Sequence, residues 1–219
     1  MLLLITGLYP HRAGMGSMAD QEIMLEGYRG HLADEAVTIA HVLKEVGYDT
    51  YTSGKWHVGD EPEHWPLQKG FDHCFSFING ATSYFTNLPY RNSEWPWSDG
   101  KLLTVDDNEM FVYPTDTLLY ATDLYTDRAI GYVNRSLETG NPFFLYLAYT
   151  APHWPLHALP EDIDRYRGRF SMGWDSLRMR RMENLMEQGL IHPATQLPGR
   201  DPSVPAWNEL PAAEQAHQQ

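Results

Sequence analysis

The segment Gly47-Tyr48-Asp49-Thr50-Tyr51-Thr52-Ser53-Gly54-Lys55-Trp56-His57 decides the fold of this 219-residue chain. Its part from Tyr48 to Ser53 is rich in Tyr and Thr, which favours a short strand. In front of it, residues 34–46 place apolar side chains at helical spacing and polar side chains on the other face, and Gly47 can end that helix. The apolar positions are Ala36, Ile39, Ala40, Leu43 and Val46. The segment therefore predicts a helix and then a strand, with Lys55 and His57 just past the strand end.

A second unit repeats this arrangement later in the chain. Thr122 can cap a helix that Gly140 ends and that Pro142 prevents from continuing. The apolar residues at helical spacing in it are Ala129, Ile130, Val133 and Leu137. Residues 143–149 then read Phe-Phe-Leu-Tyr-Leu-Ala-Tyr, which is apolar on both alternating sets and is typical of a strand buried on both faces of a parallel sheet. We therefore predict an α/β fold: part of a mainly parallel sheet sandwiched by helices.

Polar side chains follow both predicted strands. Lys55 and His57 follow the first, and the turn Thr-Ala-Pro-His-Trp-Pro at 150–155, which contains His153, follows the second. Ligands of open α/β sheets bind outside the carboxyl ends of the strands, so these three side chains are expected to converge on one crevice. A cation that holds an anionic oxygen and imidazoles that move protons suit an ester of sulfate or phosphate. Taken singly, each residue has a simpler interpretation as a solvated lysine or a histidine packed in a turn.

Composition narrows the function classes. Sixteen basic against 29 acidic residues give a net charge of -13, and no Lys/Arg block tracks a phosphate backbone, so nucleic acid is not an expected partner. No apolar stretch approaches the roughly 20 residues of a membrane span, and residues 1–7 are too short and lack the basic flank of a signal peptide. We expect a soluble chain whose compartment stays open. Cys74 is the only cysteine, so no disulfide forms within the chain, and it is expected to be buried.

Several other patterns favour structural roles. Asp106-Asp107 reads as a polar turn between strands, and the remaining histidines form no zinc motif. The loop Glu-Trp-Pro-Trp at 94–97 packs on its own domain or walls an aryl pocket. Residues 172–188 predict a helix with an apolar inner face, and its arginines are expected to form a solvated outer face. The inner residues are Leu177, Met182 and Leu185, and the arginines are Arg178, Arg180 and Arg181.

The pattern Gly47-Tyr48-x-Thr50-x-x-Ser53-Gly54-Lys55-x-His57 matches, position by position, the second characteristic motif of the sulfatase family. Residues 3–12, Leu-Leu-Ile-Thr-Gly-Leu-Tyr-Pro-His-Arg, resemble the stretch that follows the family's nucleophile motif, and residues 142–155 resemble its strand and Ala-Pro-His turn. The resemblance covers nearly the whole chain and is closest to bacterial-type arylsulfatases. It implies the alkaline-phosphatase-like core and the hydrolysis of small-molecule sulfate esters.

The resemblance also implies roles for three residues. Lys55 resembles the lysine that contacts the sulfate oxygens. His57 resembles the histidine that hydrogen-bonds the nucleophile and assists the release of sulfate, and His153 resembles the one that faces the sulfate and the leaving oxygen. Two alternatives stay open: a phosphonate or phosphate ester hydrolase of the same superfamily, and a non-catalytic anion-binding pseudoenzyme.

The family further implies a calcium ion and a formylglycine nucleophile, made from the first residue of Cys-x-Pro-x-Arg. That pentapeptide is expected just before Leu3, and the chain contains neither it nor the family's metal-ligating aspartates and Asp-Asn pair. We therefore expect an internal piece of a sulfatase with little or no activity alone and with no metal ligand of its own. Residues 1–190 are expected to be part of the catalytic domain, and residues 191–219 a Pro-rich extended connection. Exposed core surface predicts self-association.

Overall fold

The computed structural model describes residues 2–19, 23, 25–85, 104–111, 117 and 119–218. Within them the chain forms two compact units, Met1–His157 and Ala158–Gln219. The aromatic loop expected at 94–97 lies outside the described residues. Among the helices described in either unit, none is long and apolar enough to cross a membrane.

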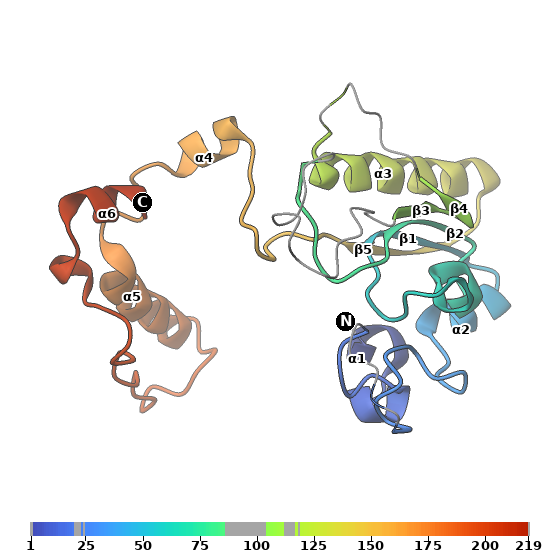
Figure 1. Ribbon diagram of the computed structural model, residues 1–219, viewed down its shortest axis with the longest axis horizontal. Coiled ribbons are helices and arrows are strands. Elements are labelled where there is room, and N and C mark those ends of the chain that lie inside the picture. Colours follow the sequence, from blue (N-terminus) through green and yellow to red (C-terminus); the bar gives the residue numbers. More distant parts are fainter. Residues whose placement is uncertain are drawn as a thin grey trace. The chain divides into compact units, whose positions relative to one another are not determined.

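The first unit is built on a five-stranded sheet with the order β4-β3-β2-β1-β5 (Figure 1). The strands are β1 Asp49–Lys55, β2 His73–Phe77, β3 Thr104–Asp106, β4 Glu109–Met110 and β5 Phe143–Ala148. Strand β1 pairs in parallel with β2 on one side and with β5 on the other. The pairs β2–β3 and β3–β4 are antiparallel. The predicted parallel core is thus confirmed, and an antiparallel hairpin extends it.

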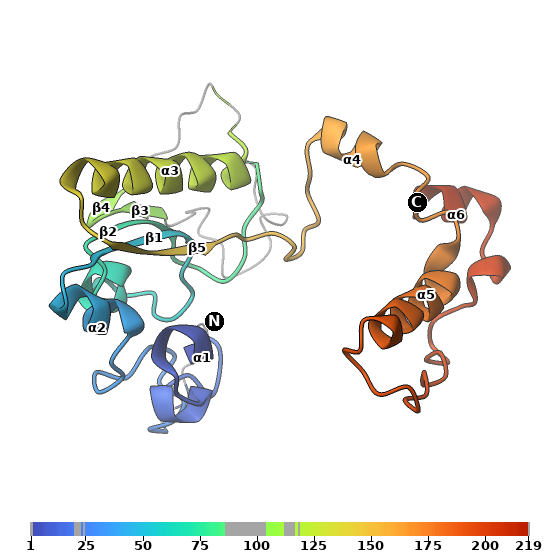
Figure 2. The same cartoon turned by 180° about the vertical axis from the view of Figure 1, so that it is seen from behind.

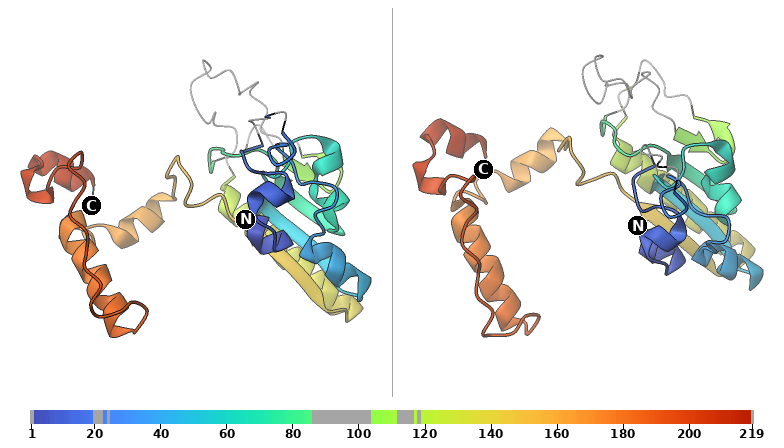
Figure 3. Two further views of the ribbon diagram at one scale, coloured as in Figure 1. Left: turned by 90° about the horizontal axis from the view of Figure 1, so that it is seen from below. Right: turned by 60° about the horizontal axis from the view of Figure 1, so that its bottom comes forward.

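Helices cover both faces of this sheet, as predicted, and α2 and α3 lie on opposite sides of it (Figures 2 and 3). Alternate residues of β1 face the two layers. Ser53 donates a hydrogen bond to the carbonyl of Tyr125 in α3 at 2.8 Å. On the other face, the hydroxyl oxygen of Thr50 lies 3.0 Å from the carbonyl oxygen of Gly70. The sheet is therefore the middle layer of three, and β1 lies in it between β2 and β5.

Two apolar clusters fill the space between the layers. The larger one contains Trp56 and Phe71 and includes Ala40 of α2. The smaller cluster, on the α3 side, joins Phe75 of β2 to Tyr125 of α3. Cys74 belongs to the larger cluster, is fully buried as predicted, and has its thiol pKa raised by burial. Both clusters contain residues of β2 and β5, the two strands that flank β1.

Helix α2, Ile39–Glu45, is shorter than the predicted 34–46 because Thr38 caps it. Thr38 has extended backbone angles, and its hydroxyl accepts a hydrogen bond from the N–H of His41 at 3.2 Å and donates to the carbonyl of Lys69. Ala40 is buried, whereas Ile39 and Val46 are exposed. The expected apolar face is therefore only partly covered by the described residues.

Helix α3, Ala121–Thr139, ends as predicted at Gly140, which adopts the left-handed conformation with φ 76°. It begins with Tyr120 as N-cap, so the prediction of a cap at Thr122 was wrong. Its inner face matches the expected set only in part: Ala129 is buried as predicted and Tyr125 and Ser136 are buried too, whereas Ile130 and Leu137 are exposed. The hydroxyl of Ser136 donates to Asp49 at 2.6 Å, which explains how a polar residue replaces an apolar one there.

Strand β5 departs from the prediction of burial on both faces. Phe143 is 39% exposed, and residues 144–148 are only partly buried. The reason is its position at the end of the described sheet, where β1 is its one described neighbour.

The polar turn at Asp106-Asp107 is confirmed: it joins β3 to β4, and Asp107 accepts hydrogen bonds from the ring of His73 and from the N–H of Cys74, both at 2.8 Å.

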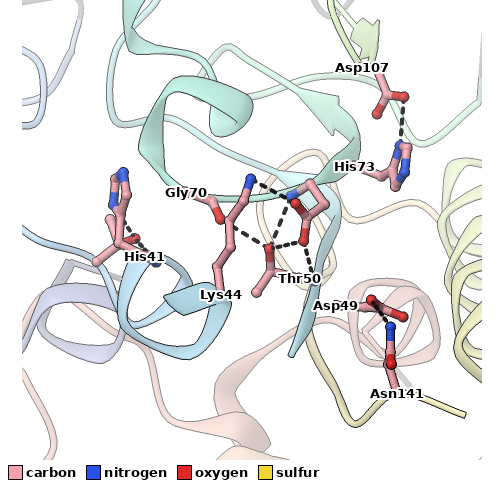
Figure 4. A network of polar contacts seen from close by, with 10 residues as sticks. His41, Lys44, Asp49, Thr50, Gly70, His73, Asp107 and Asn141 are labelled. Carbon is pink, nitrogen blue, oxygen red and sulfur yellow. Dashed lines mark hydrogen bonds and ion pairs between the residues drawn. The ribbon is translucent and has the colours of Figure 1, made fainter. Parts of the chain in front are cut away.

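A polar network ties the elements together where β1 and β2 begin (Figure 4). The carboxylate of Asp72 accepts from the N–H of Thr50 at 2.9 Å and from its hydroxyl at 2.8 Å. The ammonium of Lys44, in α2, lies 2.7 Å from the other oxygen of Asp72. Asp49 likewise accepts from Asn141, which precedes β5, at 3.0 Å. These contacts hold α2 and the starts of β1, β2 and β5 together, at the end of the sheet opposite to Lys55.

The remaining elements of the first unit are short. They are α1 Leu2–Thr6, η1 Pro10–Ala13, η2 Pro62–His64 and η3 Pro66–Lys69.

The second unit holds α4 Pro160–Tyr166, α5 Gly173–Glu187, η4 Trp207–Glu209 and α6 Ala212–His217. The helix predicted over 172–188 is therefore present as α5. Trp207 packs edge-on against Trp174, with ring centroids 4.9 Å apart. The backbone N–H of Trp207 donates a hydrogen bond to the carboxylate of Asp175 at 2.9 Å. Residues 191–206 contain no helix or strand. The expected division into a catalytic part over 1–190 and a connection over 191–219 stays a prediction.

Candidate active site

Gly54 and Lys55 end strand β1. Gly54 has φ 110°, and its Cα lies against the carbonyl of Ala148 in β5, so that a Cβ would overlap that group. Only glycine fits this close approach in this backbone conformation. Lys55 follows directly and is partly buried. Burial lowers the pKa of Lys55, and no charged neighbour contributes to that shift. The strand end therefore holds a lysine in surroundings that favour an anionic ligand as its counter-charge.

His57 sits in a constrained loop conformation just after the strand. Its φ of 48° is unusual for a residue with a side chain, and its N–H donates to the carbonyl of Ile78 at 3.0 Å. The ring lies over Gly80: a Cβ on Gly80 would come within 2.7 Å of the His57 Nε2 atom. The backbone and the absence of a side chain at residue 80 together set where this imidazole lies.

His153 lies in the turn that follows β5. Its N–H donates to the carbonyl of Thr150 at 2.9 Å, and its ring Nδ1 lies 2.6 Å from the carbonyl oxygen of Trp154. A carbonyl oxygen only accepts, so Nδ1 carries the proton in this contact. The Nε2 atom is then the one that can take or give a proton. The residue is exposed, which leaves this ring accessible to a ligand.

Tyr84 is a residue that the sequence analysis missed. It is almost fully buried, and its hydroxyl donates to the carbonyl of His153 at 2.5 Å and lies 3.2 Å from that of Thr150. Its stretch, Ala-Thr-Ser-Tyr-Phe at 81–85, has no periodicity and matches no motif, so nothing in the sequence pointed to it. The structure thus adds a buried support beneath the turn that carries His153.

Lys55, His57 and His153 lie at the same end of the sheet, where the parallel strands β1 and β5 finish. Strands β1 and β5 are parallel, and Gly54 pairs with Ala148, so Lys55 and the turn that starts at Thr150 leave the sheet side by side. His57 follows Lys55 at the same edge. The arrangement brings one lysine and two histidine-bearing turns to the same end of the sheet, which is a composition suited to bind a tetrahedral anion and to move protons to and from it. The individual roles stay predictions.

The described residues show no metal-binding cluster. No group of three or more His, Cys, Asp or Glu among them could hold a metal ion, so the expected calcium does not fit this part of the chain. A cavity of about 410 Å³ lies at the opposite edge and is lined by residues that include Lys44, Asp49 and Asp72. Its two carboxylates are already hydrogen-bonded within the protein. Because this cavity lies where β1 begins and Lys55 lies where β1 ends, the cavity is separate from the candidate active site.

Comparison with known proteins assigns the class. The Sulfatase family model matches residues 2–207. An arylsulfatase of Klebsiella aerogenes is 34% identical over 203 residues, which is 90% of this chain and 41% of that relative. An uncharacterised sulfatase of Schizosaccharomyces pombe is 31% identical over 223 residues, 97% of this chain and 40% of that relative. The crystal structure of Ps i-CgsB in complex with k-i-k-neocarrahexaose is similar with a TM-score of 0.58 and 31% identity, over 75% of this chain and 36% of that one.

The chain therefore belongs to the sulfatase family. The fold predicted from the sequence, an alkaline-phosphatase-like α/β core, is confirmed by these relatives and by the sheet described above. The chain spans about 40% of the length of the curated relatives that it matches over almost all of its residues.

Proposed function

We propose that the whole protein hydrolyses sulfate monoesters and that Lys55, His57 and His153 lie in its active site. The observation that carries the proposal is their common position at the carboxyl ends of two parallel strands. What supports it beyond geometry is membership of a family whose named members include arylsulfatases. The reaction class follows from the site's chemistry, since a cation and proton-transfer groups suit a charged ester.

Each residue has a chemical task in this proposal. The ammonium of Lys55 lies next to sulfate oxygens, and its lowered pKa reflects burial that an anion would offset. As the attacking oxygen bonds to sulfur and the bond between sulfur and the ester oxygen breaks, the leaving oxygen takes a proton from Nε2 of His153; the ring is doubly protonated at this step and keeps its Nδ1 proton on the carbonyl of Trp154. His57 donates a hydrogen bond to the attacking oxygen and assists sulfate release. General acid catalysis of this kind contributes roughly 10²- to 10⁴-fold to a rate.

A calcium ion and a formylglycine nucleophile belong to this proposal only at the level of the family. They would supply charge neutralisation and the attacking oxygen. The described residues contain no cluster suited to the metal. We propose that other segments of the whole protein provide both groups.

The proposed substrate is a small-molecule sulfate ester. One relative is named an arylsulfatase, and one similar structure is a complex with k-i-k-neocarrahexaose. Phenols and sugar alcohols both fit the proposal, because Lys55 and the two histidines contact the sulfate group, and other loops of the whole protein contact the alcohol.

The test compares three substrate classes on the whole protein: an aryl sulfate, an aryl phosphate diester and an aryl phosphonate. We expect the sulfate ester to have the highest kcat/KM, and the His153→Ala variant to lose about 10²-fold on it. A preference for the phosphorus esters would overturn the assignment to sulfate. Specific sulfate binding without turnover of any ester would favour the anion-binding alternative.

A further inference from the structure

One short loop contacts both candidate histidines. It runs from Ile78, directly after β2, to Tyr84. At its start the carbonyl of Ile78 accepts the N–H of His57 at 3.0 Å, and Gly80 lies beneath the His57 ring. His57 therefore takes both its backbone position and its ring position from this loop.

The end of the same loop contacts the turn after β5. The Tyr84 hydroxyl donates to the carbonyl of His153 at 2.5 Å, and the carbonyl of Thr150 lies 3.2 Å away. These two carbonyls bracket the segment that presents the His153 ring. Burial raises the pKa of Tyr84, so its hydroxyl keeps its proton and remains a donor at neutral pH.

Tyr84 is itself fixed from two other directions. Its backbone carbonyl accepts the N–H of Ala121, the first residue of α3, at 2.7 Å. Its own N–H donates to the Nδ1 atom of His157 at 3.3 Å. A buried residue that is hydrogen-bonded through its hydroxyl, its backbone carbonyl and its backbone N–H moves little, so it can serve as a rigid reference for the exposed His153.

We propose that the 78–84 loop is the positioning device of the active site: it fixes His57 and His153 relative to each other, with Gly80 and Tyr84 as positioning residues. The inference rests on the proposed function, because it assigns a purpose to the spacing of those two histidines. Proton transfer requires the donor to lie within hydrogen-bond reach of the reacting oxygen, and a displacement of about 1 Å can cost roughly 100-fold in rate.

The decisive experiment measures the Tyr84→Phe variant of the whole protein on two aryl sulfates. One has a good leaving group, 4-nitrophenol, and the other a poor one, phenol. A displaced proton donor matters more for the poor leaving group, so kcat should fall about tenfold more for phenyl sulfate than for 4-nitrophenyl sulfate. An unchanged ratio of the two kcat values would overturn the inference for Tyr84.

Tyr51→Phe is the matched control. Tyr51 is equally buried, and its hydroxyl makes hydrogen bonds to Ser136 at 2.9 Å and to Asp49 at 3.3 Å, at the opposite edge of the sheet. Its loss should lower the unfolding temperature as Tyr84→Phe does and leave the leaving-group ratio unchanged. A ratio that changes equally in both variants would mean a general structural effect and would overturn the inference.

The variant His153→Ala separates this inference from the proposed function. If it shows the leaving-group dependence and Tyr84→Phe adds nothing to it in the double variant, both residues act through one proton donor. If His153→Ala leaves the ratio as in the unchanged protein, the proposed function fails at His153. If His153→Ala changes the ratio and Tyr84→Phe does not, only the positioning inference fails.

A second readout needs no turnover. The ring signals of the two histidines in an NMR spectrum of this chain can be assigned by their loss in His57→Ala and His153→Ala. We expect Tyr84→Phe to shift or broaden the His153 signal alone, and Gly80→Ala to shift the His57 signal alone. Gly199→Ala, where a Cβ meets nothing within 4 Å, is the control and should move neither. Signals unchanged in both loop variants would overturn the inference whatever the kinetics show.

Discussion

Gly54 lies with its Cα against the carbonyl group of Ala148, at the point where β1 and β5 end side by side. The φ of Gly54 is 110°, a conformation that residues with a side chain rarely adopt. This contact sets the distance between the two strands immediately before Lys55 and the Thr150 turn leave the sheet. The glycine of the sequence motif therefore has a structural reason that does not depend on catalysis.

The first prediction concerns that contact. Gly54→Ala should lower the free energy of unfolding by about 3 kcal/mol, because it adds both an unfavourable backbone conformation and an overlap with β5. Gly131→Ala is the control: Gly131 lies in α3, and a Cβ there meets nothing, so alanine should stabilise by about 0.5 kcal/mol. Urea unfolding monitored by circular dichroism gives both values. Equal midpoints for the two variants would contradict the argument.

The second prediction concerns Asp72 and pH. Burial alone would raise the pKa of Asp72, but hydrogen bonds from Lys44 and Thr50 outweigh it and lower the pKa below its usual value. A carboxyl group with a lowered folded-state pKa stabilises the fold at pH values above its unfolded pKa of about 3.9, and that stabilisation is lost as the pH falls through the folded pKa.

At pH 7, Asp72→Asn should therefore destabilise the protein by about 2 kcal/mol, because hydrogen bonds to a charged group are lost. The difference from the unchanged protein should shrink as the pH falls from 5 towards 2. Thermal unfolding across this range measures it. Glu138→Gln changes an exposed carboxylate of α3 and should stay within about 0.5 kcal/mol at every pH. A constant difference for Asp72→Asn down to pH 2 would show that its charge is not the cause.

Much of the first unit could be predicted from the sequence because local patterns and tertiary structure agree there. The Tyr- and Thr-rich run predicted a strand that is present as β1, and the glycines at 47 and 140 follow the ends of α2 and α3. Lys55 was predicted just past a strand that ends at Ser53, and in the structure it is the last residue of β1. The tertiary packing was harder: Ser136 is buried through its hydrogen bond to Asp49, and apolar Leu137 next to it is exposed.

The site could be predicted only where it lies next to a recognisable element. His57 and His153 follow strands directly, so their common edge follows from parallel pairing. Tyr84 could not be found in this way. It lies in no helix or strand, and its hydroxyl contacts backbone carbonyls 66 and 69 positions away in the sequence. A hydrogen bond to a backbone carbonyl places no demand on the identity of the partner residue, so it leaves no pattern in the sequence.

The third prediction concerns Lys55. Lys55→Met keeps the length and removes the charge, so sulfate binding should weaken and kcat/KM of the whole protein for an aryl sulfate should fall about 10²-fold or more. Lys44→Met is the matched control, because Lys44 pairs with Asp72 at the opposite edge. It should lower stability and leave kcat/KM close to that of the unchanged protein. A similar loss of kcat/KM in both variants would argue against a direct contact between Lys55 and sulfate.

The fourth prediction concerns the second unit. The ring of Trp207 lies so close to Gly173 that a Cβ on Gly173 would overlap it, and it also packs on Trp174. Trp207→Ala should remove about 3 kcal/mol of packing from this unit and raise amide hydrogen exchange across residues 158–218, while the strands of the first unit stay protected. Leu190→Ala, at a residue 65% exposed in the same unit, should leave exchange unchanged. Exchange that rises equally in β1 and β5 would mean that the two units unfold together, which would contradict the division after His157.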